Sequence, residues 1–391
     1  MAAPNGRCRP RGGPRVPLSR AGRGLCHIAS ELQWNASVPP LEAVHRRILV
    51  RHLADFPVGG FAFVMATGII SIAAAQLGHS QLSRLLFLLN LVAFPALWLL
   101  TLLRLVHFPL ACLADLHDHQ RGPSLLTVVA GTSVLGTQIS LLTPYQSLAA
   151  ALWLGGLGLW AGITYALFTA ATMRPVKPPP HVSLDGTWLL VVVAPESLAI
   201  LGTHVAGVFA KAAMADAAAL CLFLLGSFFY LIIVTLILYR WLFEPMRPDQ
   251  LTPSYWVNMG AAAITALAGS RLVSVVSTNL ALADIRGLIL GETILFWTVA
   301  TWWIPLLLAV TIWRHLVAGV PLSYRLEYWS AVFPVGMYTA ASWTLSHAVG
   351  ADSLLVISRI FTWIAVTAWS VTFIGMMLHL AALVRQRGKS W

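Results

Sequence analysis

The most unusual charged residue is Glu196, which follows Pro195 inside a long apolar stretch. A carboxylate is costly in an apolar environment, so it needs a proton, a hydrogen bond or water. His204 lies eight residues further on, about two helical turns, so an α-helix would present both side chains on one face. The two groups could therefore exchange a proton. The alternative is a structural role, in which Trp, Ser or Asn side chains satisfy them.

Phe333 and Pro334 lie together in another apolar stretch. A proline inside a helix removes one backbone hydrogen bond and bends the helix, and the freed carbonyl then needs another partner. A phenyl ring beside such a bend could close a pore by excluding water. Its edge carries positive quadrupole character, which anions tolerate better than cations do. Ordinary packing of an apolar side chain is the alternative for Phe333.

Two basic residues could attract anions. Arg271 follows Gly269 and Ser270 near the end of one apolar stretch, and Lys211 lies near the end of another. At the end of a membrane-spanning helix, either side chain could draw anions into a vestibule. Alternatively, a long basic side chain extends to the membrane interface without any role in binding.

One short segment is rich in histidine and aspartate, the residue types that bind metals. A solvated loop beside a membrane explains the same cluster, and we predict no metal site there. The segment contains His107, Asp115, His117, Asp118 and His119.

Several motifs of pumps and enzymes are missing from the sequence. It contains no G-x-x-x-x-G-K-[ST], which argues against ATP-driven pumping, and neither G-x-S-x-G nor H-E-x-x-H, which argues against common hydrolases. The four cysteines show no C-x-x-C spacing. We therefore predict no catalytic residue, no cofactor and no metal, and interpret the chain as a non-enzyme.

Membrane-spanning helices must position these residues. Of the 391 residues, 58% are apolar and 10% charged, whereas soluble domains carry about 25% charged residues. Long uncharged runs recur, each near the roughly 20 residues that cross a bilayer, and a β-barrel would show shorter alternating segments. We predict ten helices, near 57–78, 85–106, 123–142, 147–172, 187–209, 214–240, 254–276, 288–313, 328–348 and 355–382.

The predicted fold is an all-α membrane protein with three parts. Residues 1–54 are expected to form a disordered basic tail, 55–385 the ten-helix transport domain, and 386–391 a cytoplasmic C-terminal tail. The formal charge is +11, and nine of the 25 basic residues lie in the first 51 positions. Basic residues favour the cytoplasmic side, so we place both termini in the cytoplasm of a multi-pass plasma-membrane protein. We interpret the positive charge as suited to contact with the lipid bilayer and predict no nucleic-acid partner.

The predicted helices are of two kinds. The first, third, fifth, seventh and ninth are rich in small and polar residues, whereas most of the others are bulkier. Small residues allow close packing of helices in lipid, and they leave space when they line a pore. If the odd helices form an inner ring, the substrate path includes Gly60, Thr67, Gly68, Thr132, Thr137, Glu196, Gly202, His204, Asn258, Gly260 and Gly336. Close packing alone is the alternative.

Short motifs in these helices resemble a known family. They are Gly60-Phe61-Ala62-Phe63-Val64-Met65-Ala66-Thr67-Gly68-Ile69, Tyr255-Trp256-Val257-Asn258-Met259-Gly260-Ala261 and Val332-Phe333-Pro334-Val335-Gly336-Met337-Tyr338, together with the stretch from Trp188 to Ala199. They are similar to motifs of the tellurite-resistance/dicarboxylate transporter family, which includes fungal malate and sulfite transporters and plant slow-type anion channels. The resemblance covers residues 55–385.

The resemblance implies five helical hairpins around a central pore, in a homotrimer with one pore in each subunit. It implies that a phenylalanine of the ninth helix occludes the pore, and Phe333 with Pro334 is the matching position. It also implies small anions as substrates, namely C4-dicarboxylates such as malate, or chloride, nitrate, sulfite and tellurite.

Our first hypothesis is therefore an anion channel or transporter with Arg271 and Lys211 in its vestibule and Phe333 as its gate. Glu196 is unexpected on a helix that lines an anion path. A proton-coupled dicarboxylate carrier using Glu196 is the second hypothesis. A membrane-embedded enzyme acting on lipid is the third.

Overall fold

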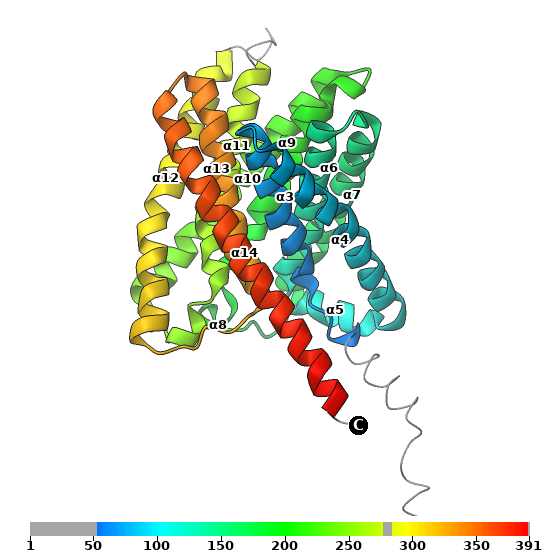
Figure 1. The fold of residues 1–391 in the computed structure, drawn as a ribbon, viewed down its shortest axis with the longest axis vertical. Coiled ribbons are helices and arrows are strands. Elements are labelled where there is room, and N and C mark those ends of the chain that lie inside the picture. Colours follow the sequence, from blue (N-terminus) through cyan, green and yellow to red (C-terminus); the bar gives the residue numbers. More distant parts are fainter. Residues whose placement is uncertain (1–52, 277–283, 390–391) are drawn as a thin grey trace, which may run out of the picture. The chain divides into compact units, whose positions relative to one another are not determined.

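The helices of this chain form an inner group and an outer group (Figure 1). The computed structural model describes residues 53–276 and 284–389, and all regular structure in this part is helical, with no strand. From Phe56 onward the described residues belong to one compact unit. The predicted all-α membrane class is confirmed. The predicted tail at 1–54 lies, apart from its last two residues, outside the described residues.

Each inner helix begins with a short 3₁₀ turn that runs directly into the α-helix. The α-helices are α3 (Ala62–Gln76), α6 (Thr127–Leu142), α9 (Leu190–Val205), α11 (Val257–Val276) and α13 (Trp329–Val349). The 3₁₀ turns before them are η1 (Val58–Phe61), η2 (Gly122–Leu126), η3 (Gly186–Leu189), η6 (Pro253–Trp256) and η9 (Leu326–Tyr328). The inner helices therefore start in the same way, although their sequences differ.

The inner helices close into a ring. α3 contacts α6, α6 contacts α9, α9 contacts α11, α11 contacts α13, and α13 returns to contact α3. These are the five helices for which small and polar residues predicted an inner position. The ring positions the residues predicted for the substrate path and the gate, together with Arg271, whereas Lys211 lies outside it.

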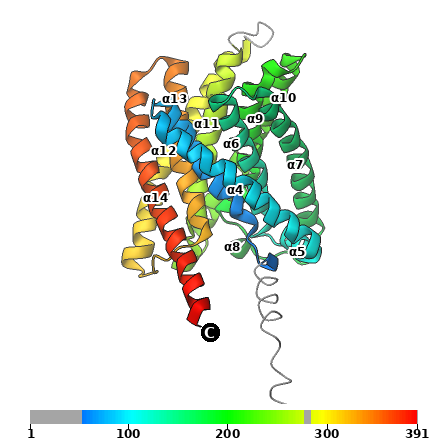
Figure 2. The same cartoon turned by 45° about the vertical axis from the view of Figure 1, so that its right-hand side comes forward.

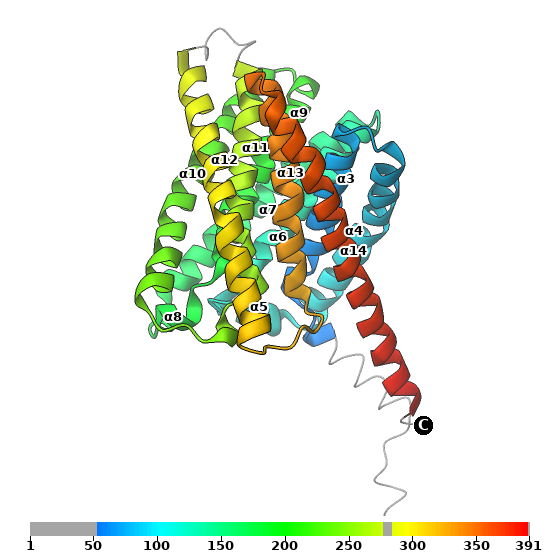
Figure 3. The ribbon, with the colours of Figure 1, turned by 60° about the vertical axis from the view of Figure 1, so that its left-hand side comes forward.

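The outer helices cover this ring. They are α4 (Ser80–His107), α7 (Gln146–Met173), α10 (Ala212–Phe243), α12 (Arg286–Ile312) and α14 (Asp352–Lys389). Each contacts the inner helix that precedes it and the next inner helix around the ring, as α4 contacts both α3 and α6. Figure 2 shows α4 crossing in front of α3, and Figure 3 shows α12 and α14 on another side. Each outer helix thus covers the contact between two neighbouring ring helices.

Burial separates the two groups clearly. In the four ring segments that qualify as candidate membrane spans, 78% to 89% of the residues are buried, against 17% to 44% in the outer helices. Exposed Leu, Val, Phe and Trp side chains on the outer helices suit a lipid solvent. The sequence-based assignment of inner and outer helices therefore agrees with the structure.

The described residues contain nine segments that are long and apolar enough to cross a membrane. The tenth predicted span, α13, is 21 residues long but carries Ser, Thr, Tyr, Trp and His side chains, and it is not among the nine. It is nevertheless packed between α3 and α11 in the ring. The count of ten spans stays a prediction at this helix.

The connecting segments are short helices and turns. They include α5 (Pro109–His117), α8 (Pro180–Ser183), η4 (Ala206–Val208), η5 (Pro248–Gln250) and the π-helical turn η8 (Trp313–Val317). At the chain end, α14 continues through Lys389. Residues 386–389, predicted as part of a tail, are therefore helical.

Candidate functional site

Two cavities lie at opposite ends of the ring. We call the one where the ring helices begin the inner cavity. It measures about 580 Å³, and its lining includes Gly59, Thr127, Leu190, Ser254 and Ser330, one from each ring helix or its 3₁₀ turn. The outer cavity, toward the other end, measures about 390 Å³. Its lining includes Ile69, Thr137, Ile200, Ile264 and Met337, again one from each ring helix.

The outer cavity is largely apolar and contains one basic cluster. Arg271 of α11 and His204 of α9 both line it, and Arg271 Nη2 lies 3.4 Å from His204 Nδ1. Arg271 Nε is buried and has no hydrogen-bond partner among the residues described. A guanidinium group with an unused donor beside a cavity can bind an anion. Thr137, also predicted, lines the same cavity.

The inner cavity is more polar, with basic and acidic side chains together. Arg121, Arg240 and Arg247 line it, as do Asp185, Asp249 and Glu327. Arg240 is buried on α10, and its guanidinium donates to the hydroxyl of Tyr255 at 2.7 Å and to the carbonyl of Leu184. The inner cavity therefore has a fixed positive charge in its wall.

Two of the three carboxyl groups that line the inner cavity, those of Asp185 and Glu327, have raised pKa values. Asp185 accepts hydrogen bonds from the Thr187 backbone N–H at 2.9 Å and from the Ser254 hydroxyl at 3.2 Å. Burial raises the pKa of Asp185, and these hydrogen bonds offset part of the effect. Burial also raises the pKa of Glu327; the positive charge of Arg325 lowers it in part, and Asp185 raises it further.

Helix direction adds to the field at the inner cavity. All five ring helices start at this end, and each helix N-terminus carries a partial positive charge of about half a unit. The C-terminal ends point the other way, toward the end of the ring where the Arg271 side chain lies. Each end of the ring therefore has a source of positive charge, the helix starts at one end and the Arg271 side chain at the other.

Phe333 lies between the two cavities. On α13, Ser330 lines the inner cavity and Met337 the outer one, and Phe333 falls between them at helical spacings of three and four residues. These spacings put the three residues on one face of the helix. Phe333 is 2% exposed. The adjacent Pro334 lies against α11, where a Cβ on Gly260 would be 2.7 Å from its ring.

The predicted glycines lie at helix contacts, because a neighbouring side chain occupies the space where each Cβ would be. A Cβ on Gly68 would lie 2.4 Å from Val134, and one on Gly336 would lie 2.8 Å from Ile69. None of them is among the residues that line the two cavities. The other three with this placement are Gly60, Gly202 and Gly260. Close packing of helices explains these glycines.

The remaining polar candidates on the ring also lie away from the cavities. The Thr67 hydroxyl accepts a hydrogen bond at 2.9 Å from the indole of Trp369 on α14. The Thr132 hydroxyl donates to a carbonyl one turn earlier. The amide atoms of Asn258 are buried and have no partner among the residues described, while its backbone carbonyl accepts from Tyr230. The hydroxyl groups of Thr67 and Thr132 therefore serve a contact between helices and a contact within one helix.

Glu196 faces the outer helix α10 rather than a cavity. It is fully buried, and a Cβ on Gly226 of α10 would lie 2.4 Å from its Oε1. His204 instead lines the outer cavity beside Arg271. The structure therefore separates the two groups that sequence spacing placed on one helix face. Lys211 is exposed before α10 and is not among the residues lining the outer cavity.

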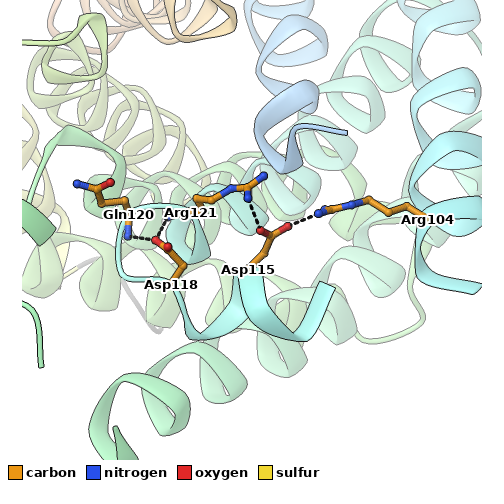
Figure 4. A network of polar contacts seen from close by, with 5 residues as sticks. All are labelled: Arg104, Asp115, Asp118, Gln120 and Arg121. Carbon is orange, nitrogen blue, oxygen red and sulfur yellow. Dashed lines mark hydrogen bonds and ion pairs between the residues drawn. The ribbon is translucent and has the colours of Figure 1, made fainter. Parts of the chain in front are cut away.

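In the segment rich in histidine and aspartate, arginine side chains form ion pairs with an aspartate (Figure 4). Asp115 forms ion pairs with Arg104 at 2.6 Å and with Arg121 at 2.9 Å. Asp118 accepts from the backbone N–H groups of Gln120 and Arg121. These contacts fasten α4, α5 and the loop after α5 together at the inner end. No group of three or more metal ligands occurs in the described residues.

Sequence reasoning missed several polar residues of the cavities. Gln76 and Thr344, which line the outer cavity, lie on α3 and α13 and are joined by a 3.4 Å hydrogen bond. Asp185, Arg240 and Glu327 of the inner cavity lie at helix ends, where charged residues are ordinary. Their position just before a ring helix, or at the end of an outer one, is the only signal that the sequence offers.

Comparison with known proteins identifies the family. Residues 55–377 match the family model described as voltage-dependent anion channel. A Mycobacterium tuberculosis protein named as an uncharacterized membrane protein is 40% identical over 163 residues, which are 42% of this chain and 82% of that protein. Two Methanocaldococcus jannaschii proteins named as uncharacterized transporters are each 23% identical, covering 83% and 85% of this chain and 94% and 95% of their own lengths. The family match spans most of the chain, and we conclude that this protein belongs to the voltage-dependent anion channel family of membrane transporters and channels.

Proposed function

We propose that small anions cross the membrane passively through the centre of the five-helix ring, between the inner and outer cavities. On α13, Ser330, Phe333 and Met337 share one face, and Ser330 lines the inner cavity whereas Met337 lines the outer cavity. This arrangement is the observation that carries the proposal. One continuous path through the ring would pass Phe333. In this proposal the phenyl ring is the gate.

Electrostatics supports anions as the substrates. The inner cavity combines the N-terminal ends of the ring helices with Arg240, and the outer cavity contains Arg271 with an unused donor. C4-dicarboxylates such as malate, and chloride, nitrate, sulfite and tellurite, are the candidate anions. Flux of each anion into liposomes that contain the full chain, measured at two pH values, ranks them directly.

Replacing Phe333 tests the gate. Phe333→Ala should raise anion conductance in a reconstituted bilayer strongly, and Phe333→Leu to a smaller extent, because a smaller side chain excludes less water. The control is Phe296→Ala, which removes an equally buried phenylalanine from the outer helix α12. Unchanged current in a well-folded Phe333→Ala protein would remove Phe333 as the gate.

A proton-coupled carrier using Glu196 is disfavoured by the position of this residue. Its carboxyl group lies against Gly226 of α10 and not among the residues of either cavity. We therefore expect Glu196→Gln to keep the pH dependence of transport seen in the unaltered protein. A flattened pH profile, measured in liposomes with equal protein content, would restore the proton-coupled mechanism.

The same separation argues against an embedded enzyme, since Glu196 and His204 do not face one cavity. The proposed assembly is a homotrimer with one path in each subunit. The proposed location is the plasma membrane, with both termini in the cytoplasm. Mass measurement of the intact detergent-solubilised complex tests the trimer, and labelling of cysteines introduced at each end of the chain tests the topology.

A further inference from the structure

A third cavity lies outside the ring, on the side where α12 and α14 flank α13. It measures about 350 Å³ and is bordered by these helices and by η6 at the start of α11. Figure 3 shows α12 and α14 diverging toward the inner end, with the lower part of α13 between them. Of the residues that line it, only Thr252 also lines the inner cavity. We call it the lateral groove.

The lateral groove is apolar along most of its length. Leu307 and Val332 are buried in its wall, whereas Ile364 and Val371 of α14 are 46% and 62% exposed at its border. The outer helices present such exposed apolar side chains to lipid. A groove of this kind accepts hydrocarbon, and its surroundings in a membrane are acyl chains.

One end of the groove contains a buried cation. Arg314 lines it, is 4% exposed, and lies in the π-helical turn Trp313–Val317 that ends α12. Its Nε has no hydrogen-bond partner, and no ion pair within 4.0 Å involves its side chain among the described residues. Glu327 acts on Arg314 only at longer range. A buried guanidinium group without an anionic partner is costly, so a ligand that supplies the anion is favoured.

Charge and shape together select one class of ligand. The ligand must offer a hydrocarbon chain for the groove and an anionic oxygen group for Arg314, at the level where the helices meet the membrane surface. An anionic phospholipid has both parts, and arginine binds phosphate with paired donors. A second copy of this chain suits the site less well, because the sequence has 25 basic but only 14 acidic residues.

We propose that the lateral groove is a binding site for an anionic phospholipid, with one acyl chain along Leu307 and Val332 and the phosphate group on Arg314. The π-helical turn supports this assignment. An extra residue in a helical turn shifts side-chain directions, and such turns occur often at functional sites. His315, in the same turn, is tied to the Val320 carbonyl at 2.8 Å, which holds the turn in place.

The test is lipid binding to the purified full chain, measured by native mass spectrometry. Phosphatidylglycerol and phosphatidylcholine with identical acyl chains are added at increasing concentrations. The unaltered protein should retain phosphatidylglycerol in preference to phosphatidylcholine. Arg314→Gln should weaken phosphatidylglycerol binding by about tenfold or more, the range expected for loss of a charge-assisted hydrogen bond.

Arg325→Gln is the matched control, because it removes the same charge from an exposed position in the neighbouring loop. It should leave the preference unchanged. Ala368→Trp tests the hydrocarbon part, since a large side chain on α14 would fill the groove and displace both lipids. This second variant keeps the proposal testable if Arg314→Gln does not fold.

Three outcomes would overturn the proposal. One is an unchanged lipid preference in folded Arg314→Gln. Another is complete displacement of the lipid by inorganic phosphate alone, which would make the site a phosphate site. The third is an oligomer in which the groove holds no lipid and Ala368→Trp causes dissociation, which would assign the groove to a second copy of the chain.

Discussion

The two cavities of the ring differ in how their charges are arranged. In the outer cavity, Arg271 and His204 form a single basic cluster in largely apolar walls. In the inner cavity, Arg121, Arg240 and Arg247 are accompanied by Asp185, Asp249 and Glu327. The outer cavity thus depends on one side chain. The inner cavity combines helix N-termini with a set of opposing charges, so its potential can change with protonation.

The walls of the two cavities also differ. At the inner end, η3 and η6 touch through their backbones, since a Cβ on Gly186 would lie 2.1 Å from the carbonyl oxygen of Ser254. At the outer cavity the walls are side chains such as Ile200, Ile264 and Met337. A backbone contact cannot relax as a side chain can, so the inner cavity should tolerate substitution less well.

Gly186→Ala should therefore have the largest effect. Its methyl group would push apart η3 and η6, and we expect the free energy of unfolding to fall by about 3 kcal/mol. Thermal unfolding in detergent measures the change. Gly155→Ala is the control, because nothing lies within 4 Å of a Cβ at that exposed position on α7. Equal melting temperatures for the two variants would contradict the backbone contact.

Arg271→Gln should have the next largest effect and tests the single cation of the outer cavity. Anion flux should fall by about tenfold or more, since a hydrogen bond to a charged group contributes about 1.5–3 kcal/mol. The measurement is anion current at low ionic strength and at high ionic strength. Lys211→Gln removes the same charge from an exposed residue outside the cavity and should change the current little. Similar losses in both variants would mean that general surface charge, not the cavity, attracts anions.

The smallest expected effect concerns the charge balance of the inner cavity. Because the pKa values of Asp185 and Glu327 are raised, both carboxyl groups take up protons at a higher pH than ordinary Asp and Glu side chains do. Loss of their negative charge as pH falls should increase anion flux, on the order of threefold. Glu327→Gln should reduce this increase.

Asp352→Asn is the control for Glu327→Gln, because Asp352 is exposed and is not among the residues that line either cavity. A flux that decreases on acidification in the unaltered protein would contradict the role assigned to these carboxyl groups. The same raised pKa values also affect stability. The folded state binds these protons more tightly than the unfolded state, so their contribution to stability grows as pH falls through the folded-state pKa.

The sequence was sufficient to place the helices and to divide them into two groups. Predicted and observed bounds agree closely for most helices, such as 123–142 for η2 and α6 together, and differ mainly where α4 starts earlier and α14 ends later. Long uncharged runs fix helix positions, and small residues mark the helices that must approach other backbones on several sides.

The direction of each ring side chain could not be predicted from the sequence. Ring helices are buried on almost all sides. The sequences of α3 and α13 therefore show no apolar face that would distinguish residues lining a pore from residues packed between helices. This is why Gly68 and Gly336 looked like lining residues and lie at helix contacts instead. The proximity of Arg271 to His204 depends on the packing of α9 against α11, across 67 positions of sequence.

The closing contact of the ring joins the beginning of the chain to its end. α3 meets α13, and α14 also contacts α3. A ribosome delivers the first hairpin to the membrane well before the last, so this seam stays open until synthesis is nearly complete. If anions cross through the ring as proposed, an unfinished chain has no enclosed path, and the order in which the hairpins arrive then limits leakage during biogenesis.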